Sequence, residues 1–360
     1  MKFPVAVLCC FSLLAGFATA KCMFSLSTDL ISKNPIILLN GDVLSPDNQD
    51  GNVTLTDGQR IQLLCSGPRN YLIMSRTSEQ DVEATCFNDR FTLIANGTRY
   101  HMQDFRCKFI PQADVRDVGE RCNDHYKKLQ IGFRVDPYRF LPKIELCFDP
   151  NRLMTYWTRH VFHTCEFSCQ LATSTPFKKD FFNDTDVDGI YKNSGYDRGH
   201  LSPKCDFFSG AEKRMTFFYL NTSPQVVNFN EKNWRVLESV IRTAAKGAKK
   251  KLYVYTGSTK FVGYLKNTIP VQLYFWKVII DKSSGKGVAF FGVNNVDSDV
   301  NSPCATIPCE RLSWLSRSFI PKMSDVTRGK IYCASINSLK TMCEIFPNFD
   351  EYTGGILTTM

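Results

Sequence analysis

Long apolar runs and histidines are scarce in this 360-residue chain, and each shortage excludes a class of structure. Beyond residue 20, no apolar stretch reaches the roughly 20 residues of a membrane span without a charge or a turn residue, so we expect no spanning helix. Internal repeats and low-complexity tracts are also missing, which argues against a repeat array. Of the five histidines, His101 and His125 are isolated, and we expect surface or packing roles for them.

Zinc ligation is disfavoured too. Two closely spaced cysteine pairs suggest a metal site, namely Cys165-x3-Cys169 and Cys304-x4-Cys309. However, His160 and His163 lie too close to the first pair for the usual spacing of a zinc finger. We therefore expect most of these cysteines to form disulfides.

The N-terminus is typical of a secretory signal peptide. Lys2 precedes an apolar run from Phe3 to Leu14, and Ala18-Thr19-Ala20 offers a small-residue cleavage site before Lys21. A membrane anchor, the alternative, needs a longer run, and the last four residues are not an endoplasmic-reticulum retention signal. We expect residues 1–20 to be removed and the mature chain to be soluble and secreted.

Cysteine usage agrees with secretion. Cys9 and Cys10 leave with the signal, so thirteen of the 15 cysteines remain, and in an oxidising compartment we expect them to be bridged. Thirteen is odd, so at least one thiol is unpaired or links to another chain. Sequons at Asn52, Asn96 and Asn183 lie in polar, turn-like surroundings and are glycosylation candidates. We expect Asn221, which shortly precedes a proline, to carry no glycan.

The formal net charge is +9, or about +8 once Lys2 is removed. An excess of this size indicates a polyanionic partner only if the basic side chains gather on one face. A solvated basic surface explains net charge alone equally well.

About 340 mature residues exceed a usual single domain, so we expect two units. Residues 21–140 alternate short apolar runs, among them 61–64, 71–74 and 91–94, with Gly-containing turn signals. This pattern predicts a small β-rich module stapled by disulfides, without a chemical motif. We place a boundary at Pro137–Pro142 and an α+β domain over residues 141–360.

Apolar patterns in the second unit predict strands and a helix. The strands are expected at residues 155–162, 215–220, 251–255, 271–280 and 287–292. Helical periodicity runs from Asn230 to Lys246, and Gly247 is expected to end the helix.

The most informative pattern is Ser-Gly-Tyr-Asp-Arg-Gly-His at residues 194–200, followed thirty positions later by Asn230-x3-Trp234-x3-Glu238. These segments supply a general base, a guanidinium for phosphate, an oxygen ligand and a carboxylate, which are the parts of metal-assisted phosphodiester cleavage. With Leu-Asn-Thr-Ser-Pro-Gln at residues 220–225, the stretch resembles the active-site signature of the DNA/RNA non-specific endonucleases, the Serratia-nuclease-like group of ββα-metal nucleases. The resemblance covers roughly residues 144–350.

The resemblance implies a ββα unit on a central antiparallel sheet and a role for each motif residue. His200 takes a proton from the attacking water, so activity should decline below about pH 6. Asn230 binds Mg²⁺, for which Mn²⁺ is a possible substitute, and Glu238 holds the ion through water. Arg198 contacts phosphate, and Asp197 is a positioning residue. Because the related nucleases do not generally have a cysteine in this stretch, Cys205 is expected to be the unpaired thiol.

Each assignment has a structural alternative. Asn230 could be a helix N-cap, His200 a packed histidine at a strand end, and Arg198 the partner of Asp197 or Glu238 in a salt bridge. Relatives place another basic residue upstream, for which Lys178 and Lys179 are loose candidates. Other basic side chains could line a duplex-binding face, namely Lys192, Arg242, Lys246, Lys249, Lys250 and Lys251. A solvated helix end explains the last four equally well.

The sequence thus predicts a secreted, Mg²⁺-dependent, sequence-independent endonuclease that cleaves double- and single-stranded DNA to 5′-phosphate products. We expect it to cleave RNA as well. It is similar to secreted arthropod nucleases, including salivary endonucleases of blood-feeding insects, and extracellular host DNA is the expected target. We expect no membrane association and no obligate protein partner. The alternative is a non-catalytic polyanion-binding protein on a nuclease scaffold.

Overall fold

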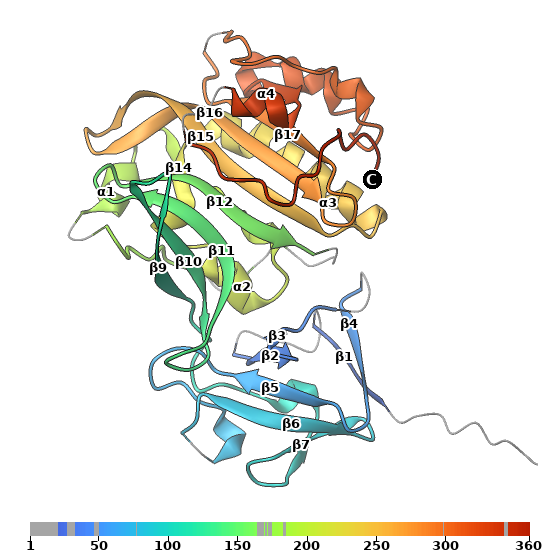
Figure 1. Ribbon diagram of the computed structural model, residues 1–360. Helices are drawn as coiled ribbons and strands as arrows, with labels where there is room; N and C mark the ends of the chain where they lie inside the picture. Colours follow the sequence, from blue (N-terminus) through green and yellow to red (C-terminus); the bar gives the residue numbers. More distant parts are fainter. Residues whose placement is uncertain are drawn as a thin grey trace, which may run out of the picture.

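The structure is a computed structural model that describes residues 21–26, 33–46, 50–76, 78–163, 169, 171, 175–182, 185–297, 299–341 and 345–360. The expected signal peptide therefore lies outside the described residues. Figure 1 shows a smaller β-rich part, coloured blue to cyan, below a larger part that contains the remaining strands and most of the helices.

The N-terminal module is built from antiparallel strands, as its sequence pattern predicts. Its six-stranded sheet has the order β3-β2-β5-β6-β7-β8, and β1 pairs with β4 separately. The strands are β1 Lys21–Ser25, β2 Ile36–Leu39, β3 Asp42–Val43, β4 Asn52–Thr56, β5 Arg60–Leu64, β6 Asp81–Phe87, β7 Arg90–Leu93 and β8 Arg99–Tyr100. Two 3-10 helices, η1 Ile73–Ser75 and η2 Met102–Asp104, complete it. The apolar run at 71–74 is therefore not a strand, since it forms one β-bridge at Leu72 and then η1.

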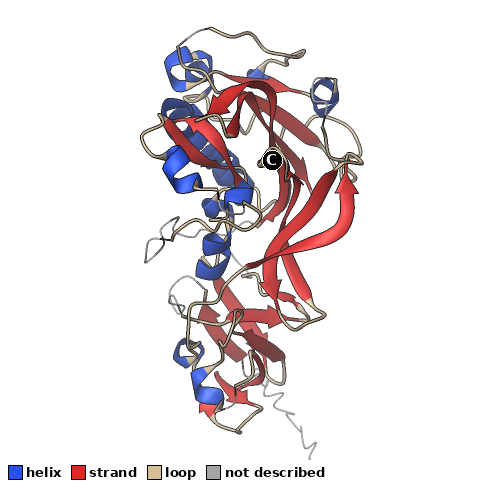
Figure 2. Ribbon diagram, turned by 90° about the vertical axis from the view of Figure 1, so that its left-hand side faces the viewer, coloured by secondary structure: helices blue, strands red, loops and turns tan. Residues whose placement is uncertain are grey.

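The larger part is organised by an eight-stranded antiparallel sheet of order β18-β17-β16-β15-β12-β11-β10-β9. Its strands are β9 Asp114–Cys122, β10 Tyr126–Arg134, β11 Phe140–Asp149, β12 Met154–Phe162, β15 Leu252–Leu265, β16 Ile269–Asp281, β17 Gly287–Val293 and β18 Ile331–Ala334. Most helical segments lie on one side of this sheet (Figure 2). The expected central antiparallel sheet is confirmed, with longer β15 and β16 than the sequence patterns suggested.

The expected boundary at residues 137–142 is wrong. It falls between β10 and β11, which pair with each other over most of their length. A boundary there would place β9 and β10 in one unit and the rest of their sheet in the other. The sheet begins at Asp114, and the apolar core of the module continues into residues such as Leu129 and Ile131 of β10.

The ββα unit lies against one face of the large sheet. β13 (Tyr196–His200) pairs antiparallel with β14 (Thr222–Val226), and the π-helix η5 (Phe229–Trp234) continues into α3 (Arg235–Gly247). Trp234, Leu237 and Ile241 pack with Phe275 and Ile279 of β16 in one buried cluster. This apolar contact fixes the helix on the sheet.

The strand predicted at 215–220 is absent. Met215 ends α2 (Gly210–Met215), and a 3-10 turn η4 (Tyr219–Asn221) leads into β14. A short apolar run does not distinguish a strand from another buried segment. The capping box of α2 was the missed signal, because Ser209 Oγ accepts from the backbone of Glu212 and the Glu212 carboxylate accepts from the backbone of Ser209.

The helix predicted from Asn230 to Lys246 is present with small shifts at its ends. Gly247 is still helical, Ala248 is the C-cap, and Lys249 takes the left-handed conformation expected of the glycine. The remaining short helices are α1 Val187–Tyr191, η3 Lys204–Asp206, η6 Cys309–Arg311, η7 Ile320–Ser324, η8 Val326–Arg328 and α4 Ile336–Lys340. Among the described helices, none combines the length and apolar character needed to span a bilayer.

Five disulfides connect described cysteines, in the pairs Cys22–Cys86, Cys65–Cys107, Cys122–Cys147, Cys169–Cys205 and Cys309–Cys333. The expectation that Cys205 is unpaired is therefore wrong. Its thiol is bonded to Cys169, and the free cysteine among the described residues is the half-buried Cys304. Cys165 and Cys343 lie outside the described residues.

The sequons divide by burial. Asn221 is fully buried, its amide donates to the carbonyls of Ser202 and Thr216, and a glycan could not attach there in the folded chain. Asn52 is exposed, and Asn96 is partly exposed with its amide donating to the carbonyl of Met74. Asn183 lies outside the described residues. Glycosylation of Asn52 and Asn96 remains a prediction.

Candidate active site

His200 ends β13 at a cavity of about 400 Å³ that also borders η5 and α3. Its ring packs against Phe177 and Phe217, with ring centroids 5.5 and 5.0 Å away. Burial, together with the positive charge of Lys204, lowers the pKa of His200 to about 4. The imidazole is therefore neutral at pH 7, and its buried Nε2 has no hydrogen-bond partner within the described structure.

Arg198 lines the same cavity, two residues before His200 on the strand. Its Nε donates to the hydroxyl of Tyr219 at 2.8 Å, and an Nη donates to Asp188 at 3.1 Å. The salt-bridge partner is thus Asp188 of α1 and not Asp197 or Glu238, the two partners considered from the sequence. Asp188 also accepts a hydrogen bond from Tyr219, which lowers the pKa of the Asp188 carboxyl, and it forms an ion pair with Lys179.

Asn230 lies inside the π-helical turn, where it cannot act as an N-cap. The N-cap is Asn228, whose side chain makes no capping bond. The Asn230 amide nitrogen instead donates to Asp197 on β13 at 2.9 Å. This bond fixes the orientation of the amide and uses its nitrogen, so the amide oxygen is the atom left for a ligand.

The π-turn also affects which side chains share a face. Asn230 and Glu238 are eight residues apart, and a regular α-helix would carry Glu238 about a fifth of a turn past Asn230. A π-turn takes more residues per turn and reduces this overshoot. Both residues line the cavity, together with Arg235 and Arg242 from the same helix.

Glu238 is held from the sheet side by a buried lysine. Lys277 of β16 is 2% exposed, its ammonium group lies 3.6 Å from the Glu238 carboxylate, and it donates to Thr256 at 2.6 Å. Burial raises the pKa of Glu238, whereas the charge of Lys277 opposes that shift. Lys277 also lies over the ring of Trp234, 5.5 Å from its centroid.

A second buried set lies beside this pair. Asp206 accepts from Arg242 at 3.0 Å and is 2.9 Å from His160 Nε2, and the other ring nitrogen of His160 is 3.0 Å from Ser202 Oγ. The hydrogen bond to His160 and the charge of Arg242 outweigh burial and lower the pKa of Asp206 to about 2. Burial lowers the pKa of His160. These contacts tie β12, η3 and α3 together behind the cavity.

The lysines proposed from the sequence lie outside the cavity. Lys178 points elsewhere, since its ammonium group donates to the carbonyl of Ala113 at 2.7 Å, and this contact argues against a phosphate role. Lys179 is near Arg198 through the shared Asp188. Lys192 is exposed. Of the other basic candidates, Arg242 lines the cavity, and Lys250 pairs with Asp281.

The amino-acid sequence matches the DNA/RNA non-specific endonuclease family over residues 124–342. The chain belongs to this family. The match covers the eight-stranded sheet from β10 onward, the ββα unit and the cavity. The protein is therefore a nuclease, and nucleic acid is its substrate class.

Salivary proteins of insects are similar to this nuclease along most of their length. A salivary endonuclease of Lutzomyia longipalpis is 23% identical over 76% of this chain and 72% of its own. Salivary protein Tsal1 of Glossina morsitans morsitans is 23% identical over 88% of both chains. A salivary endonuclease of Culex quinquefasciatus is 24% identical over 84% of this chain and 83% of its own.

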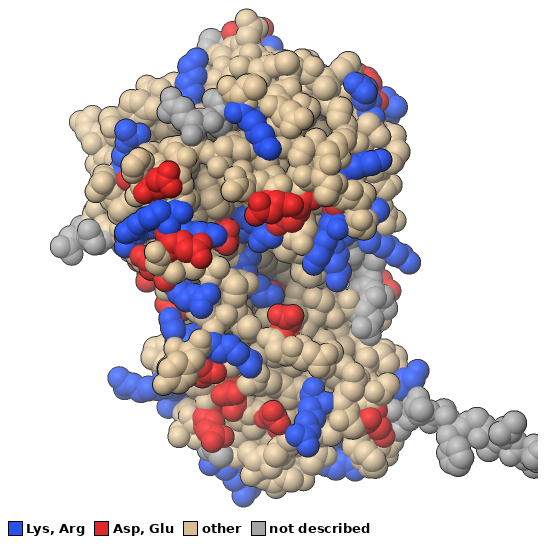
Figure 3. Space-filling view, viewed as in Figure 1, with Lys and Arg blue, Asp and Glu red and all other residues tan. Residues whose placement is uncertain are grey.

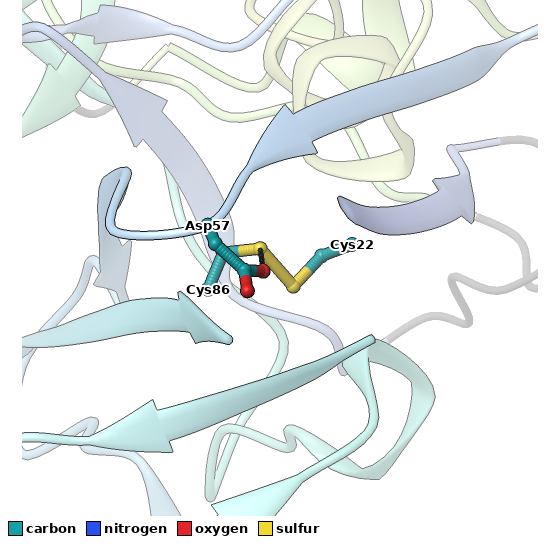
Figure 4. Close-up of side chains that lie close together, drawn as sticks. All are labelled: Cys22, Asp57 and Cys86. Carbon is teal, nitrogen blue, oxygen red and sulfur yellow. Dashed lines mark hydrogen bonds between the residues drawn. A yellow bond between two sulfur atoms is a disulfide. The ribbon is translucent and has the colours of Figure 1, made fainter. Parts of the chain in front are cut away.

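The donor set at the nuclease cavity fits a hard cation. An amide oxygen and a carboxylate suit Mg²⁺, which keeps several waters and takes few protein oxygens. Asn230 and Glu238 supply these groups on one helix face. The tightest His, Cys, Asp and Glu group in the described structure, Cys22 with Asp57 and Cys86, is no competitor, because its sulfurs are bonded to each other (Figure 4).

The motif alone did not show the full lining of the cavity. Lys204, Phe177 and Phe217 also line it, and Tyr219 with Asp188 positions Arg198. One part of the lining could have been predicted from the sequence. Charged residues recur at helical spacing and all line the cavity, namely Glu231, Arg235, Glu238 and Arg242. The contact between Asp188 and Arg198 joins separate elements and has no comparable local signal.

Proposed function

We propose that this nuclease is a secreted, Mg²⁺-dependent endonuclease that hydrolyses DNA, and RNA as well, without sequence preference and leaves 5′-phosphates. The observation that supports this most is the joint lining of one cavity by Arg198, His200, Asn230 and Glu238. Each supplies a different requirement of phosphodiester hydrolysis.

His200 acts as the general base. Its neutral imidazole at pH 7 accepts a proton from the water that attacks phosphorus. The enclosed, unpartnered Nε2 is a ring nitrogen with free capacity for such a bond. The rings of Phe177 and Phe217 restrict the orientation of the imidazole.

Arg198 orients the scissile phosphate through its guanidinium, which Tyr219 and Asp188 hold in place. Asn230 would hold Mg²⁺ through its amide oxygen, with Glu238 acting through water, and Mn²⁺ would substitute. The ion supplies neutralisation of charge on the phosphate and on the leaving 3′ oxygen. Asp197 fixes the amide of Asn230, and Lys277 fixes Glu238.

The groups around the cavity suit phosphate, water and cation, and contacts of this kind carry no sequence information. Cleavage is therefore spread along any DNA, and binding weakens steeply with salt. On the face in Figure 3, basic and acidic side chains are interspersed and no single basic patch covers that face. The net charge of +9 alone thus gives little support to nucleic-acid binding.

Secretion is supported by the five disulfides and by the salivary relatives. Extracellular DNA released by host cells is the proposed target. The competing function is non-catalytic binding of polyanions. The presence of all four motif residues in one cavity favours catalysis over binding alone.

The decisive experiment is digestion of plasmid DNA and of an RNA transcript by secreted protein, with Mg²⁺ and with a chelator. We expect cleavage of both substrates with Mg²⁺ and none with the chelator. End-mapping of limited digests at two ionic strengths tests sequence independence. Binding without cleavage in Mg²⁺ or Mn²⁺ would establish the competing function, and a short fixed recognition sequence would refute sequence independence.

A further inference from the structure

A second large cavity lies on the opposite face of the eight-stranded sheet. Its volume is about 660 Å³, within the range of ligand-binding cavities, and it shares no lining residue with the catalytic cavity. Along β16, Gln272 and Tyr274 line it, whereas Phe275 and Lys277 contact the ββα unit. Successive side chains of a strand point to opposite faces, so the sheet separates the two cavities.

Aromatic rings form much of this second cavity. The pairing of β11 with β12 skips Tyr156, and the bulge lets this ring face the cavity. Tyr126 lies against it, with ring centroids 4.6 Å apart, and Tyr274 adds a third ring from β16.

The rim carries two aromatic side chains that the fold leaves exposed. Phe261 is 51% exposed and Tyr264 is 54% exposed, and their ring centroids are 4.8 Å apart. They pair across the hairpin with Gln272 and Pro270, which line the cavity, so all four lie on its side of the sheet. The hairpin of β15 and β16 projects at the upper left of Figure 1.

The charged side chains that line this cavity are both basic, Arg152 and Lys260. Lys260 places its ammonium group 5.7 Å from the ring centroid of Tyr274, and Arg152 donates to the Tyr156 hydroxyl at 3.4 Å. Asp149 lies 3.9 Å from Arg152, but it is buried and accepts from backbone amides. A ligand entering from solvent therefore meets rings and positive charge.

We propose that this cavity is a second binding site for single-stranded nucleic acid, with bases against its aromatic rings and phosphates at Arg152 and Lys260. Rings interleaved with cations suit single strands, because unstacked bases expose faces that a duplex conceals. This inference rests on the nucleic-acid-cleaving function proposed above. It adds a holding site on the face of the sheet away from the chemistry.

The test compares binding in a cleavage-deficient His200→Ala background, with chelator. The probe is a fluorescein-labelled oligothymidylate of about 20 nucleotides, longer than one stacking site. Substituting Phe261→Ala with Tyr264→Ala should raise its Kd at least about 5-fold, since each base stack contributes about that much or more. A duplex of equal length should be affected less. Phe87→Ala with Tyr138→Ala, which removes two exposed rings that do not line this cavity, is the matched control.

An unchanged oligothymidylate Kd in the hairpin variant would overturn the proposal. So would an unchanged Kd accompanied by a shift from dimer to monomer, which would mark the rings as a self-association face. If thermal unfolding shows the variant misfolded, Lys260→Glu gives a second measurement, a salt dependence of binding weaker by about one phosphate contact. Plasmid cleavage by the wild-type chain with Mg²⁺ tests the proposed function separately, so the two failures are distinguishable.

Discussion

The ion pair described in the N-terminal module lies in solvent, whereas those behind the candidate catalytic cavity are buried. In the module, the side chains of Arg60 and Glu83 are 70% and 54% exposed. Behind the cavity, Lys277 is 2% exposed and Glu238 is 11% exposed. Exposed pairs contribute about 0–1 kcal/mol, but a buried charge that loses its partner is strongly destabilising.

The two regions are consequently stabilised in different ways. The module combines an apolar core, which includes Leu63 and Phe105, with the disulfides Cys22–Cys86 and Cys65–Cys107. The ββα unit relies on apolar contacts of α3 and on polar groups that satisfy one another. Substitutions in the cavity should therefore change chemistry or leave a charge unpaired, whereas those in the module should change stability alone.

The largest expected effect is that of Asn230→Ala. Loss of the amide oxygen should reduce Mg²⁺-supported cleavage to background, because the ion would lose the direct protein ligand that we propose. Stability should fall by only about 0.5–1.5 kcal/mol, the value of the lost bond to Asp197. Asn228→Ala is the matched control, since that side chain makes no capping bond. Near-normal cleavage by folded Asn230→Ala protein would exclude the ligand role.

His200→Ala should reduce turnover at least about 100-fold, the low end for loss of a general base. DNA binding should persist, because the phosphate contact that we propose for Arg198 is untouched. Turnover is measured at saturating substrate, with His101→Ala of the module as control. Wild-type turnover in a pure, folded His200→Ala protein would remove this residue from the mechanism.

Much of the ββα unit could be predicted because its signals are local. The spacing from His200 to Asn230 and the helical repeat through Trp234 lie within forty residues, and both residues line one cavity. Two predictions failed because contacts between distant segments decide the outcome. Pairing of β10 with β11 moved the boundary, and bonding of Cys169 to Cys205 could not be deduced, because spacing does not determine disulfide connectivity.

The buried contact between Lys277 and Glu238 could not be predicted from the sequence for a related reason. Lys277 lies in an apolar strand pattern, and only the packing of α3 on β16 brings it to Glu238. A lysine in such a strand looks like an interruption of the core until its partner is known. The same limit applies to Arg198, whose contacts with Asp188 and Tyr219 come from separate elements.

Lys277→Met tests whether the buried ion pair at the cavity contributes more to stability than the exposed pair in the module. It removes the cation that lies 3.6 Å from Glu238, and the expected loss of unfolding free energy is about 3–5 kcal/mol. Adding Glu238→Gln should restore part of that loss, because the unpaired charge is then gone. Arg60→Ala in the module should cost less than about 1 kcal/mol. Equal losses in denaturant titrations of Lys277→Met and Arg60→Ala would break the comparison.

Replacing Cys65 and Cys107 by alanine tests whether changes in the N-terminal module affect stability alone. Loss of this disulfide should lower the unfolding free energy by about 2–4 kcal/mol, with a lower Tm in calorimetry. Specific activity well below the transition should equal that of the wild type, because no cavity-lining residue belongs to the module. A large loss of kcat in the folded variant would show that the module supports the catalytic site.

The smallest expected effect is on the pH dependence of activity, which should be lost at a lower pH than an ordinary histidine base would give. A histidine base must be neutral, so activity falls as pH drops through its pKa, and burial places that pKa at about 4 for His200. At pH 5 about 90% of such a base is neutral, against about 3% for a histidine at the reference pKa of about 6.5. The profile of kcat/KM, which reports the free enzyme, should therefore stay high down to about pH 5, and not decline below 6 as the reference value implies. Lys204→Gln should move the limit upward slightly, since its charge helps to lower that pKa. A midpoint of kcat/KM near pH 6.5 in protein that stays folded there would contradict the burial of a neutral His200.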